Sequence, residues 1–244
     1  MNKNSNTYII VYSVVMVVIV AVLLSVTAMS LQNRQNENRL GEKKQAILAS
    51  LSAADRNFDD YIDAYAVDSD GNRTEVDDVF ALTEDLKAAF EAGTYPVFEA
   101  QDGRVVVPVT GNGLWGPIWG YVALENDMNT VAGVVFDHSG ETPGLGAEIA
   151  TPKHQAQYRG KQIFDGDEFV SVRLRKGGAQ DARHEVDAIS GGTKTSDGVT
   201  AMLDSSLRNY LPFFADRRAA QNTARECCNE EEETHDGQNA ESNE

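Results

Sequence analysis

The sequence predicts an α+β protein, in which a single N-terminal transmembrane helix precedes one domain made of an antiparallel sheet and flanking helices. Three observations predict it: an uncharged apolar run near the N-terminus, strand-like runs paired across short polar turns, and helical periodicity on both sides of those pairs. The 244 residues allow one or two domains. We expect an anchor at 1–33, an amphipathic helical connector at 34–75, the α+β domain at 76–215 and an acidic disordered tail at 216–244.

The apolar run extends from Tyr8 to Met29 and is almost wholly aliphatic. At about 1.5 Å per residue it spans about 33 Å as a helix, which matches the hydrocarbon thickness of a bilayer. The core of a cleaved signal peptide is about 7–15 residues long, so the length favours an uncleaved anchor. A cleaved signal is the alternative, because the segment 28–30 (Ala-Met-Ser) weakly resembles a cleavage site.

Positive charges flank this run unequally. Lys3 precedes it, and Arg34, Arg39, Lys43 and Lys44 follow within about 20 residues. Counted by the positive-inside rule alone, this distribution favours the cytoplasm for the large domain, but Glu37 and Glu42 dilute the bias and the charges do not settle the side.

Helical spacing continues after the anchor. A long or broken amphipathic helix is predicted by Leu40, Ile47, Leu51, Ala54, Phe58, Ile62 and Tyr65. A short helix that Gly93 ends is predicted by Val79, Leu82, Leu86 and Phe90.

Two hairpins follow. The runs 95–100 and 105–109 flank Asp102-Gly103, which is a turn signal, and the runs 119–124 and 131–136 flank a polar stretch at 125–129. Further along, Thr151 and Pro152 are typical of an N-cap and a first helical position. The alternating run 169–175 predicts a half-buried strand, and apolar spacing predicts a last helix from about Asp197 to near Pro212.

Composition excludes several classes of protein. Lys and Arg total 21 against 38 Asp and Glu, so the net charge is −17, which argues against nucleic-acid binding. Eight of the acidic residues lie in the last 19 positions, where no Lys or Arg occurs. The two cysteines, Cys227 and Cys228, are adjacent and suit neither a disulfide framework nor a zinc site, and the four histidines are scattered. We therefore expect no metal site.

The stretch 187–199 is the best candidate for a binding site. Gly191 and Gly192 allow a loop with exposed N–H groups, and the following helix start adds the positive end of its dipole, so a phosphate would be stabilised there. Lys194 adds a cation, and Thr193 presents a hydroxyl. A glycine turn with Thr195 or Ser196 as N-cap is the simpler alternative. The spacing is neither that of a P-loop nor that of a Rossmann fingerprint.

Asp187-x-x-Ser190-Gly191-Gly192-Thr193 resembles the D-x-x-S-G-A-T flavinylation motif. The resemblance implies that a separate flavin transferase, using FAD, esterifies the Thr193 hydroxyl with the phosphate of FMN. Position 192 departs from the motif, because glycine stands where alanine is usual. Glycine fits sterically but is expected to loosen the loop.

Three further blocks lie upstream of this motif, at 113–120 (Gly-Leu-Trp-Gly-Pro-Ile-Trp-Gly), 129–133 (Asn-Thr-Val-Ala-Gly) and 140–148 (Gly-Glu-Thr-Pro-Gly-Leu-Gly-Ala-Glu). With the anchor they resemble the C subunit of the sodium-translocating NADH:quinone oxidoreductase, over a range from the anchor to roughly Phe214. The G subunit of the Rnf electron-transport complex, which shares the flavin motif, is the alternative, as is a lone membrane-anchored FMN-binding module. The acidic tail departs from the family pattern.

The resemblance implies a flavoprotein that relays single electrons. They come from NADH by way of an iron centre in membrane subunits D and E, and pass to the flavin of the B subunit and then ubiquinone, coupled to sodium export. Subunits A, B, D, E and F and the flavin transferase are the implied partners. The implied location is the bacterial inner membrane, with one membrane pass and the large domain in the periplasm, against the charge count. No catalytic residue is expected, because the cofactor carries the chemistry.

The resemblance also implies roles for residues of the phosphate loop. Ser190, Gly191 and Gly192 are expected to shape the loop around Thr193. Asp187 is expected either to be recognised by the transferase or to brace the turn. A hydrolase built on Ser190, His138 and Asp187 is disfavoured, because Ser190 lacks the G-x-S-x-G elbow.

A second loop is expected to lie against the isoalloxazine ring, with Leu145 packed on the ring and polar contacts from its acidic residue and threonine; its residues are Glu141, Thr142, Pro143, Gly144 and Leu145. A plain glycine–proline turn is the alternative. Lys176 is expected to stabilise reduced flavin and raise its potential, unless it is a plain surface lysine. Trp115 is a candidate to stack near the cofactor, and a buried tryptophan at a strand start is the alternative.

Overall fold

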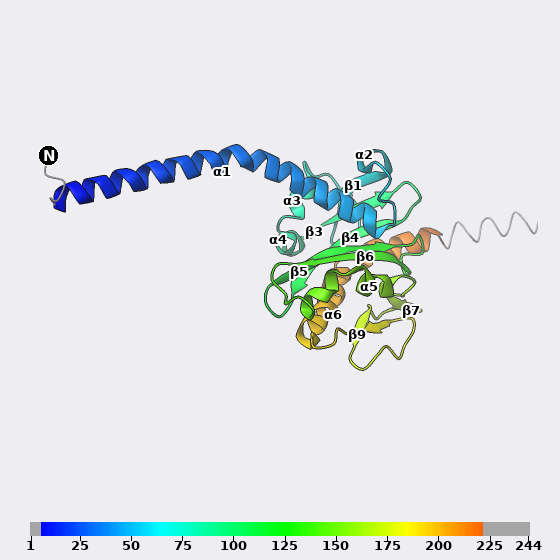
Figure 1. Cartoon of the computed structure of the whole chain (residues 1–244). Coiled ribbons are helices and arrows are strands. Elements are labelled where there is room, and N and C mark those ends of the chain that lie inside the picture. Colours follow the sequence, from blue (N-terminus) through cyan, green and yellow to red (C-terminus); the bar gives the residue numbers. More distant parts are fainter. Residues whose placement is uncertain (1–5, 222–244) are drawn as a thin grey trace, which may run out of the picture. The chain divides into compact units, whose positions relative to one another are not determined.

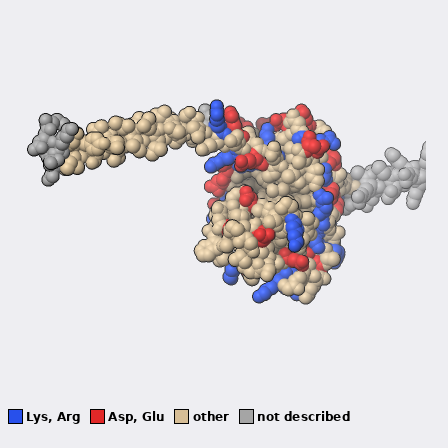
Figure 2. Space-filling model, viewed as in Figure 1, with Lys and Arg blue, Asp and Glu red and all other residues tan. Residues whose placement is uncertain are grey.

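The computed structural model describes residues 6–221, and the chain divides into two compact units, Met1–Lys44 and Gln45–Glu244. The first unit consists of the larger part of helix α1 (Asn6–Ser50). By length and composition α1 is apolar enough to cross a membrane. Figure 2 shows no charged side chain along its apolar stretch, whereas acidic and basic side chains are interspersed over the visible face of the second unit. A helix is therefore confirmed where the anchor was expected.

The second unit is built on a six-stranded sheet, in the order β2-β1-β3-β4-β5-β6 (Figure 1). All five strand pairs in it are antiparallel. Both predicted hairpins are confirmed, as β3 with β4 and as β5 with β6. The strands are β1 (Ile62–Asp68), β2 (Arg73–Thr74), β3 (Thr94–Ala100), β4 (Val105–Asn112), β5 (Pro117–Leu124) and β6 (Val131–His138).

Both faces of the sheet are covered. Val97 and Val107 point into one core, which includes Val199 and Leu203 of helix α6 (Thr193–Arg208). Their strand neighbours point into the opposite core, with the last turns of α1, helix α2 (Phe58–Tyr61) and helix α3 (Val79–Leu82); these neighbours include Phe98 and Val106. Alternate residues of a strand point to opposite faces, so the apolar runs of β3 and β4 supply both cores.

The connector differs from its prediction. The helical spacing was expected to run through Tyr65, but α1 ends at Ser50 and residues 62–68 form β1, which pairs with β3 along its whole length. The apolar residues of β1 are shared between the two cores. The N–H and C=O groups of a strand find their hydrogen-bond partners on another strand, often far away in the sequence. Such pairing leaves no sign in the local spacing of apolar residues.

The short helix predicted around residues 79–90 is two helices. Asp85 accepts a hydrogen bond from the backbone N–H of Ala88 and begins α4 (Leu86–Glu91) anew after α3. Gly93, with φ of +70°, follows the C-cap and confirms the predicted stop.

The strand predicted at 169–175 is interrupted. Residues Glu168–Phe169 form β8, which pairs with β7 (Phe164–Asp165), and Arg173–Arg175 form β9, which pairs in parallel with β10 (Glu185–Asp187). Between them Ser171 has φ of 60°, a left-handed conformation that ends regular strand pairing. The alternation of apolar residues in this run did not reveal that kink.

The helical elements between β6 and β7 are short. Thr151 caps α5 (Pro152–Gln155), as predicted, between the 3₁₀ turns η1 (Gly146–Ala150) and η2 (Ala156–Tyr158). Helix α6 begins at Thr193, one turn before the predicted start, and Pro212 lies near the start of a further helix at 211–221. That helix enters the range expected to be tail from 216. The rest of the expected tail, including Cys227 and Cys228, lies outside the described residues.

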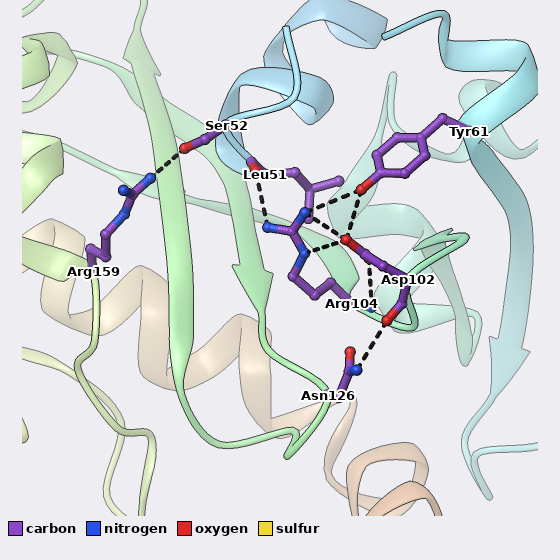
Figure 3. Close-up of polar contacts among 7 residues, drawn as sticks. All are labelled: Leu51, Ser52, Tyr61, Asp102, Arg104, Asn126 and Arg159. Carbon is purple, nitrogen blue, oxygen red and sulfur yellow. Dashed lines mark hydrogen bonds and ion pairs between the residues drawn. The ribbon is translucent and has the colours of Figure 1, made fainter.

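The C-terminal end of α1 is fixed to the sheet by two arginines (Figure 3). Ser52 has φ of 56°, and the N–H groups of Ser52 and Ala53 donate to carbonyls of the last turn, as in a Schellman motif. Arg104 donates to the carbonyl of Leu51 at 3.0 Å and is held by Asp102, while Arg159 donates to the Ser52 hydroxyl. Burial by itself would raise the pKa of Asp102. Hydrogen bonds from Arg104 and Tyr61 outweigh it and lower that pKa, so the carboxylate stays charged.

Gly133 of β6 allows the last turn of α1 to lie close to the strand, because a Cβ at this position would lie 2.4 Å from the carbonyl oxygen of Ser50. We expect Gly133→Ala to lower the free energy of unfolding by about 1–3 kcal/mol, since one backbone must move away from the other. Thermal melts of the full chain measure this. Gly140→Ala is the matched control, because a Cβ at Gly140 meets nothing within 4 Å. Equal melting temperatures for the two variants would show that the contact is not tight.

Candidate functional site

The loop before α6 presents the Thr193 hydroxyl at the start of a helix. Gly191 has φ of +74°, and Gly192 is the N-cap, so the cap has no side chain. Thr193 is the first helical residue and is exposed. The first N–H groups of a helix have no partner within it and lie at the positive end of its dipole. The start of α6 therefore combines a glycine loop, a helix N-terminus and an exposed hydroxyl, the three features on which the predicted anion site depends.

The simpler alternative for this loop was wrong, because neither candidate cap lies at the N-cap. Thr195 and Ser196 lie inside α6 and are buried. The Ser196 hydroxyl accepts a hydrogen bond from the N–H of Ile189 at 3.0 Å, which closes the loop from inside. Ser190 is exposed beside Gly191.

The Glu141 carboxylate joins three sequence blocks that are far apart in the chain. It is only 4% exposed. One oxygen accepts the Thr195 hydroxyl at 2.6 Å, and the other accepts the N–H of Trp115 at 2.8 Å. The Gly-Leu-Trp block, the Glu-Thr-Pro-Gly loop and helix α6 therefore meet on one carboxylate.

Two glycines make room for that carboxylate. A Cβ at Gly113 would lie 2.4 Å from Glu141 Oε1, and a Cβ at Gly146 would lie 2.3 Å from Glu141 Oε2. Burial alone would raise the pKa of Glu141, but hydrogen bonds from Thr195 and from the backbone of residues 114–116 outweigh it and lower that pKa. Both oxygens thus accept hydrogen bonds from the protein, so Glu141 braces the loops that meet on it.

The loop 141–145 lies directly against the phosphate loop. A Cβ at Gly191 would lie 2.6 Å from Leu145 Cδ2, and a Cβ at Gly192 would lie 3.4 Å from the backbone nitrogen of Gly146. Leu145 is 42% exposed, and Thr142, Pro143 and Gly144 are exposed with it. An apolar side chain is therefore left uncovered beside Gly191, two residues before Thr193.

Trp115 is held by its backbone, and its side chain is free. Its N–H binds Glu141, while the indole is 69% exposed. The alternative of a buried tryptophan at a strand start was therefore wrong. Leu114 beside it is also exposed.

Asp187 braces a neighbouring turn and does not contact the phosphate loop through any described hydrogen bond. Its Oδ1 accepts the N–H of Ala179 at 2.8 Å, across the turn that contains Gly177 and Gly178, both with positive φ. Lys176 begins that turn and is exposed. Asp187 is the last residue of β10, the strand that leads into the phosphate loop. Its hydrogen bond to Ala179 therefore places the turn after Lys176 next to the end of that strand.

A groove of about 530 Å³ runs along α6 from the turn after Thr193. Its lining carries both signs of charge, from arginines of β9 and acidic residues of β10 and α6; among the lining residues are Arg173, Arg175, Glu185, Asp197 and Asp204. Only Asp197 of these residues lies in the stretch 187–199 that the sequence singled out, because a charged position on a strand carries no signal of which helix lies beside it. Thr195 was considered only as a cap, because no local pattern indicates its hydrogen bond to Glu141, which lies 54 residues away.

Comparison with known proteins gives the family. A model of the FMN-binding domain matches residues 113–208. The C subunit of the Na(+)-translocating NADH-quinone reductase from Vibrio vulnificus (strain YJ016) is 32% identical over 226 residues, which cover 80% of this chain and 89% of that protein. The chain belongs to this family of C subunits. The C subunit from Pseudomonas aeruginosa is also 32% identical, over 83% of this chain and 91% of its own length.

Solved structures of this family have the same fold. The C subunit from Parabacteroides distasonis superposes with a TM-score of 0.69 at 39% identity, over 75% of this chain and 96% of its own. NqrC from Shewanella oneidensis gives 0.63 at 30% identity, over 73% and 99%. The predicted family resemblance and fold class are thereby confirmed. Matches over about nine-tenths of the relatives favour the NADH-quinone reductase family over the Rnf-type and lone-module alternatives.

Proposed function

We propose that this chain carries FMN as a phosphoester on Thr193 and relays electrons within a sodium-translocating NADH–quinone reductase. The observation that carries the proposal is the exposed Thr193 hydroxyl at the first residue of α6, directly after a glycine loop. The FMN-binding domain model spans this position, and the curated relatives are named as the C subunit of that enzyme.

The residues present fit a phosphoester. The first N–H groups of α6 are free of partners within the helix and can donate hydrogen bonds to a phosphate. Lys194, exposed in the first turn, adds a positive charge. Thr193 is reachable from solvent, as a transferase requires. Ser190, Gly191 and Gly192 form the rim of this loop, which the buried Ser196 hydroxyl keeps closed.

The flavin ring needs a surface that is apolar and shielded on one side. We propose that Leu145 offers it, because it is exposed, lies against Gly191 and belongs to the loop that Glu141 begins. The exposed indole of Trp115 is a second candidate, since its backbone N–H is bound to the Glu141 carboxylate. When bound, the flavin supplies the one-electron redox chemistry; the chain supplies attachment, position and electrostatics.

The proposed place in the enzyme is between an iron centre of subunits D and E and the flavin of the B subunit, on the path to ubiquinone, coupled to sodium export. Subunits A, B, D, E and F are the proposed partners, with α1 as the membrane anchor. We propose that the second unit faces the periplasm. The four cations after the apolar run favour the opposite side, so protease accessibility of the second unit in intact spheroplasts is the measurement that decides.

The test is the intact mass of the full chain expressed with and without a flavin transferase. A gain equal to FMN minus water, found only with the transferase, supports the attachment. A chain that gains no mass overturns it. The place in the enzyme is tested separately, by isolating the tagged chain from membranes: the five other subunits should copurify, and isolation of the chain alone would leave a lone FMN module.

We also expect Lys176→Ala to lower the midpoint potential of the attached flavin by about 40 mV, because an exposed cation near the ring contributes about 1 kcal/mol to a reduced, anionic ring in a one-electron couple. Redox titration of the flavin absorbance measures the shift. Lys87→Ala is the control, since Lys87 belongs to α4 and pairs with Glu91. The same potential in both variants would return Lys176 to a plain surface role.

A further inference from the structure

Gln157 of η2 holds the end of the strand that leads into the phosphate loop. Its Oε1 accepts the N–H of Asp187, the last residue of β10, at 3.0 Å. This N–H points away from β9, because the N–H of the next residue, Ala188, donates to the carbonyl of Arg175 in β9 at 3.0 Å. The end of β10 is therefore fixed on one edge by its neighbouring strand and on the other edge by a side chain that lies 30 residues earlier in the chain.

The amide of Gln157 is itself held in one orientation. Because its oxygen faces Asp187, its NH₂ group faces Nδ1 of His154 at 3.4 Å, and this nitrogen must accept. The proton of a neutral His154 then lies on Nε2, which is 3.2 Å from the Tyr158 hydroxyl. His154 is buried, and burial lowers its pKa against a smaller opposing effect of the Asp187 charge, so the ring is neutral near pH 7. A buried histidine thus orients the amide.

The segment between Asp187 and Thr193 is short and is fixed by hydrogen bonds at both ends. The N–H of Ile189 donates to the Ser196 hydroxyl, and the N–H of Gly192 donates back to the Ile189 carbonyl, each at 3.0 Å. These two bonds set the shape of the loop and join it to α6. The bonds at the end of β10 set the place where the loop begins.

We propose that Gln157 is a positioning residue for the attachment of FMN, which acts by fixing the point from which the phosphate loop starts. Without its oxygen, the end of β10 is held from the β9 edge alone, and the Thr193 hydroxyl spends less time in the position that a transferase needs. The two hydrogen bonds described for the Gln157 side chain go to Asp187 and His154, so it acts on Thr193 only through the strand end. The attachment part of this inference rests on the proposed function, and the hold on β10 does not.

The test compares three variants of the full chain. Gln157→Met keeps the length of the side chain and loses the acceptor. Gln157→Glu is the rescue, because it keeps an acceptor for the Asp187 N–H, and His154 can meet the carboxylate with its proton on Nδ1. Gln155→Met is the matched control, since Gln155 belongs to the same stretch of short helices but donates to the carbonyls of Phe136 and Ile149.

Amide hydrogen exchange measures the hold on β10 without any flavin. In Gln157→Met, the exchange rate at Asp187 should rise by about 3–10-fold relative to the rate at Ala188, whose N–H is bonded to β9. Glutamate should restore the native ratio of the two rates, and Gln155→Met should leave that ratio unchanged.

The rate of flavin attachment measures the positioning of Thr193. In a timed reaction with the flavin transferase and excess FAD, kcat/KM for the chain should fall by about 3–10-fold in Gln157→Met, the loss expected when one hydrogen bond no longer contributes. It should recover in Gln157→Glu. Gln155→Met should keep the native value at a temperature where every variant is folded.

An unchanged exchange ratio in Gln157→Met would overturn the inference, as would a glutamate variant that behaves like the methionine variant, because the loss would then be one of packing. If the native chain takes up no FMN, the proposed function fails, while exchange at Asp187 still decides whether Gln157 holds the strand end. If exchange responds but kcat/KM does not, Gln157 holds β10 without positioning Thr193, which overturns its assigned role.

Discussion

Thr193→Ala is expected to abolish covalent FMN while leaving the domain folded. The substitution removes the only atom that can form the proposed ester, the hydroxyl oxygen. It costs little stability, because Thr193 is exposed, and among the described residues no hydrogen bond to its side chain is found. Alanine is also a better helix former than threonine. The melting temperature should therefore change by no more than about 2 °C.

Intact mass and in-gel flavin fluorescence of the denatured protein measure the effect. Thr193→Ser is the matched control, because it keeps a hydroxyl at the same position, and it should accept FMN at a reduced rate. Thr195→Ala provides the opposite contrast, since it should lower the melting temperature and leave the attachment hydroxyl in place. A Thr193→Ala chain that still gains the mass of FMN minus water would move the attachment to another residue.

Glu141→Gln is expected to lower the free energy of unfolding by about 3 kcal/mol, which corresponds to about 6–12 °C in melting temperature. The carboxylate accepts hydrogen bonds on both oxygens from a hydroxyl and from backbone N–H groups, and it is buried. An amide would turn an NH₂ group towards one of those donors. Since the brace joins three loops, FMN uptake should fall with stability.

The pH dependence of that effect identifies its cause. The pKa of Glu141 in the folded chain lies below its ordinary value of 4.5. The stabilisation is therefore complete above that value and is lost as the pH falls towards the folded pKa. The gap between the native chain and Glu141→Gln should thus be widest near pH 7 and should shrink in acid. A gap that stays constant down to acid pH would mean that the loss is steric.

Two further variants isolate the brace. Glu168→Gln removes a charge from an exposed position of β8 and should leave the melting temperature unchanged. Thr195→Val breaks the same hydrogen bond from its other end. Thr195→Val and Glu141→Gln disturb the same hydrogen bond. The loss of stability in the double variant should therefore be smaller than the sum of the losses in the two single variants. Full additivity would show that the two residues do not act together.

Local signals located some elements well. The hairpins were predictable because turn residues and alternating apolar runs lie next to each other in the chain, as at Asp102-Gly103. The start of α5 was predictable because Thr151 and Pro152 form a cap within one turn. Elements that depend on distant partners were mispredicted. Strand β1 had helical spacing and became a strand because β3 pairs with its entire length.

The site follows the same division. The sequence by itself determined the anchor helix, the glycine loop before a helix, the threonine at its start and the family to which these belong, since each depends on residues that are close in the chain. Only the tertiary structure decided that Glu141 braces the site, that Trp115 is exposed, and that Asp187 supports the turn after Lys176. These outcomes depend on which groups meet across 8–54 residues of chain, and a carboxylate bonds whichever donors the fold brings to it.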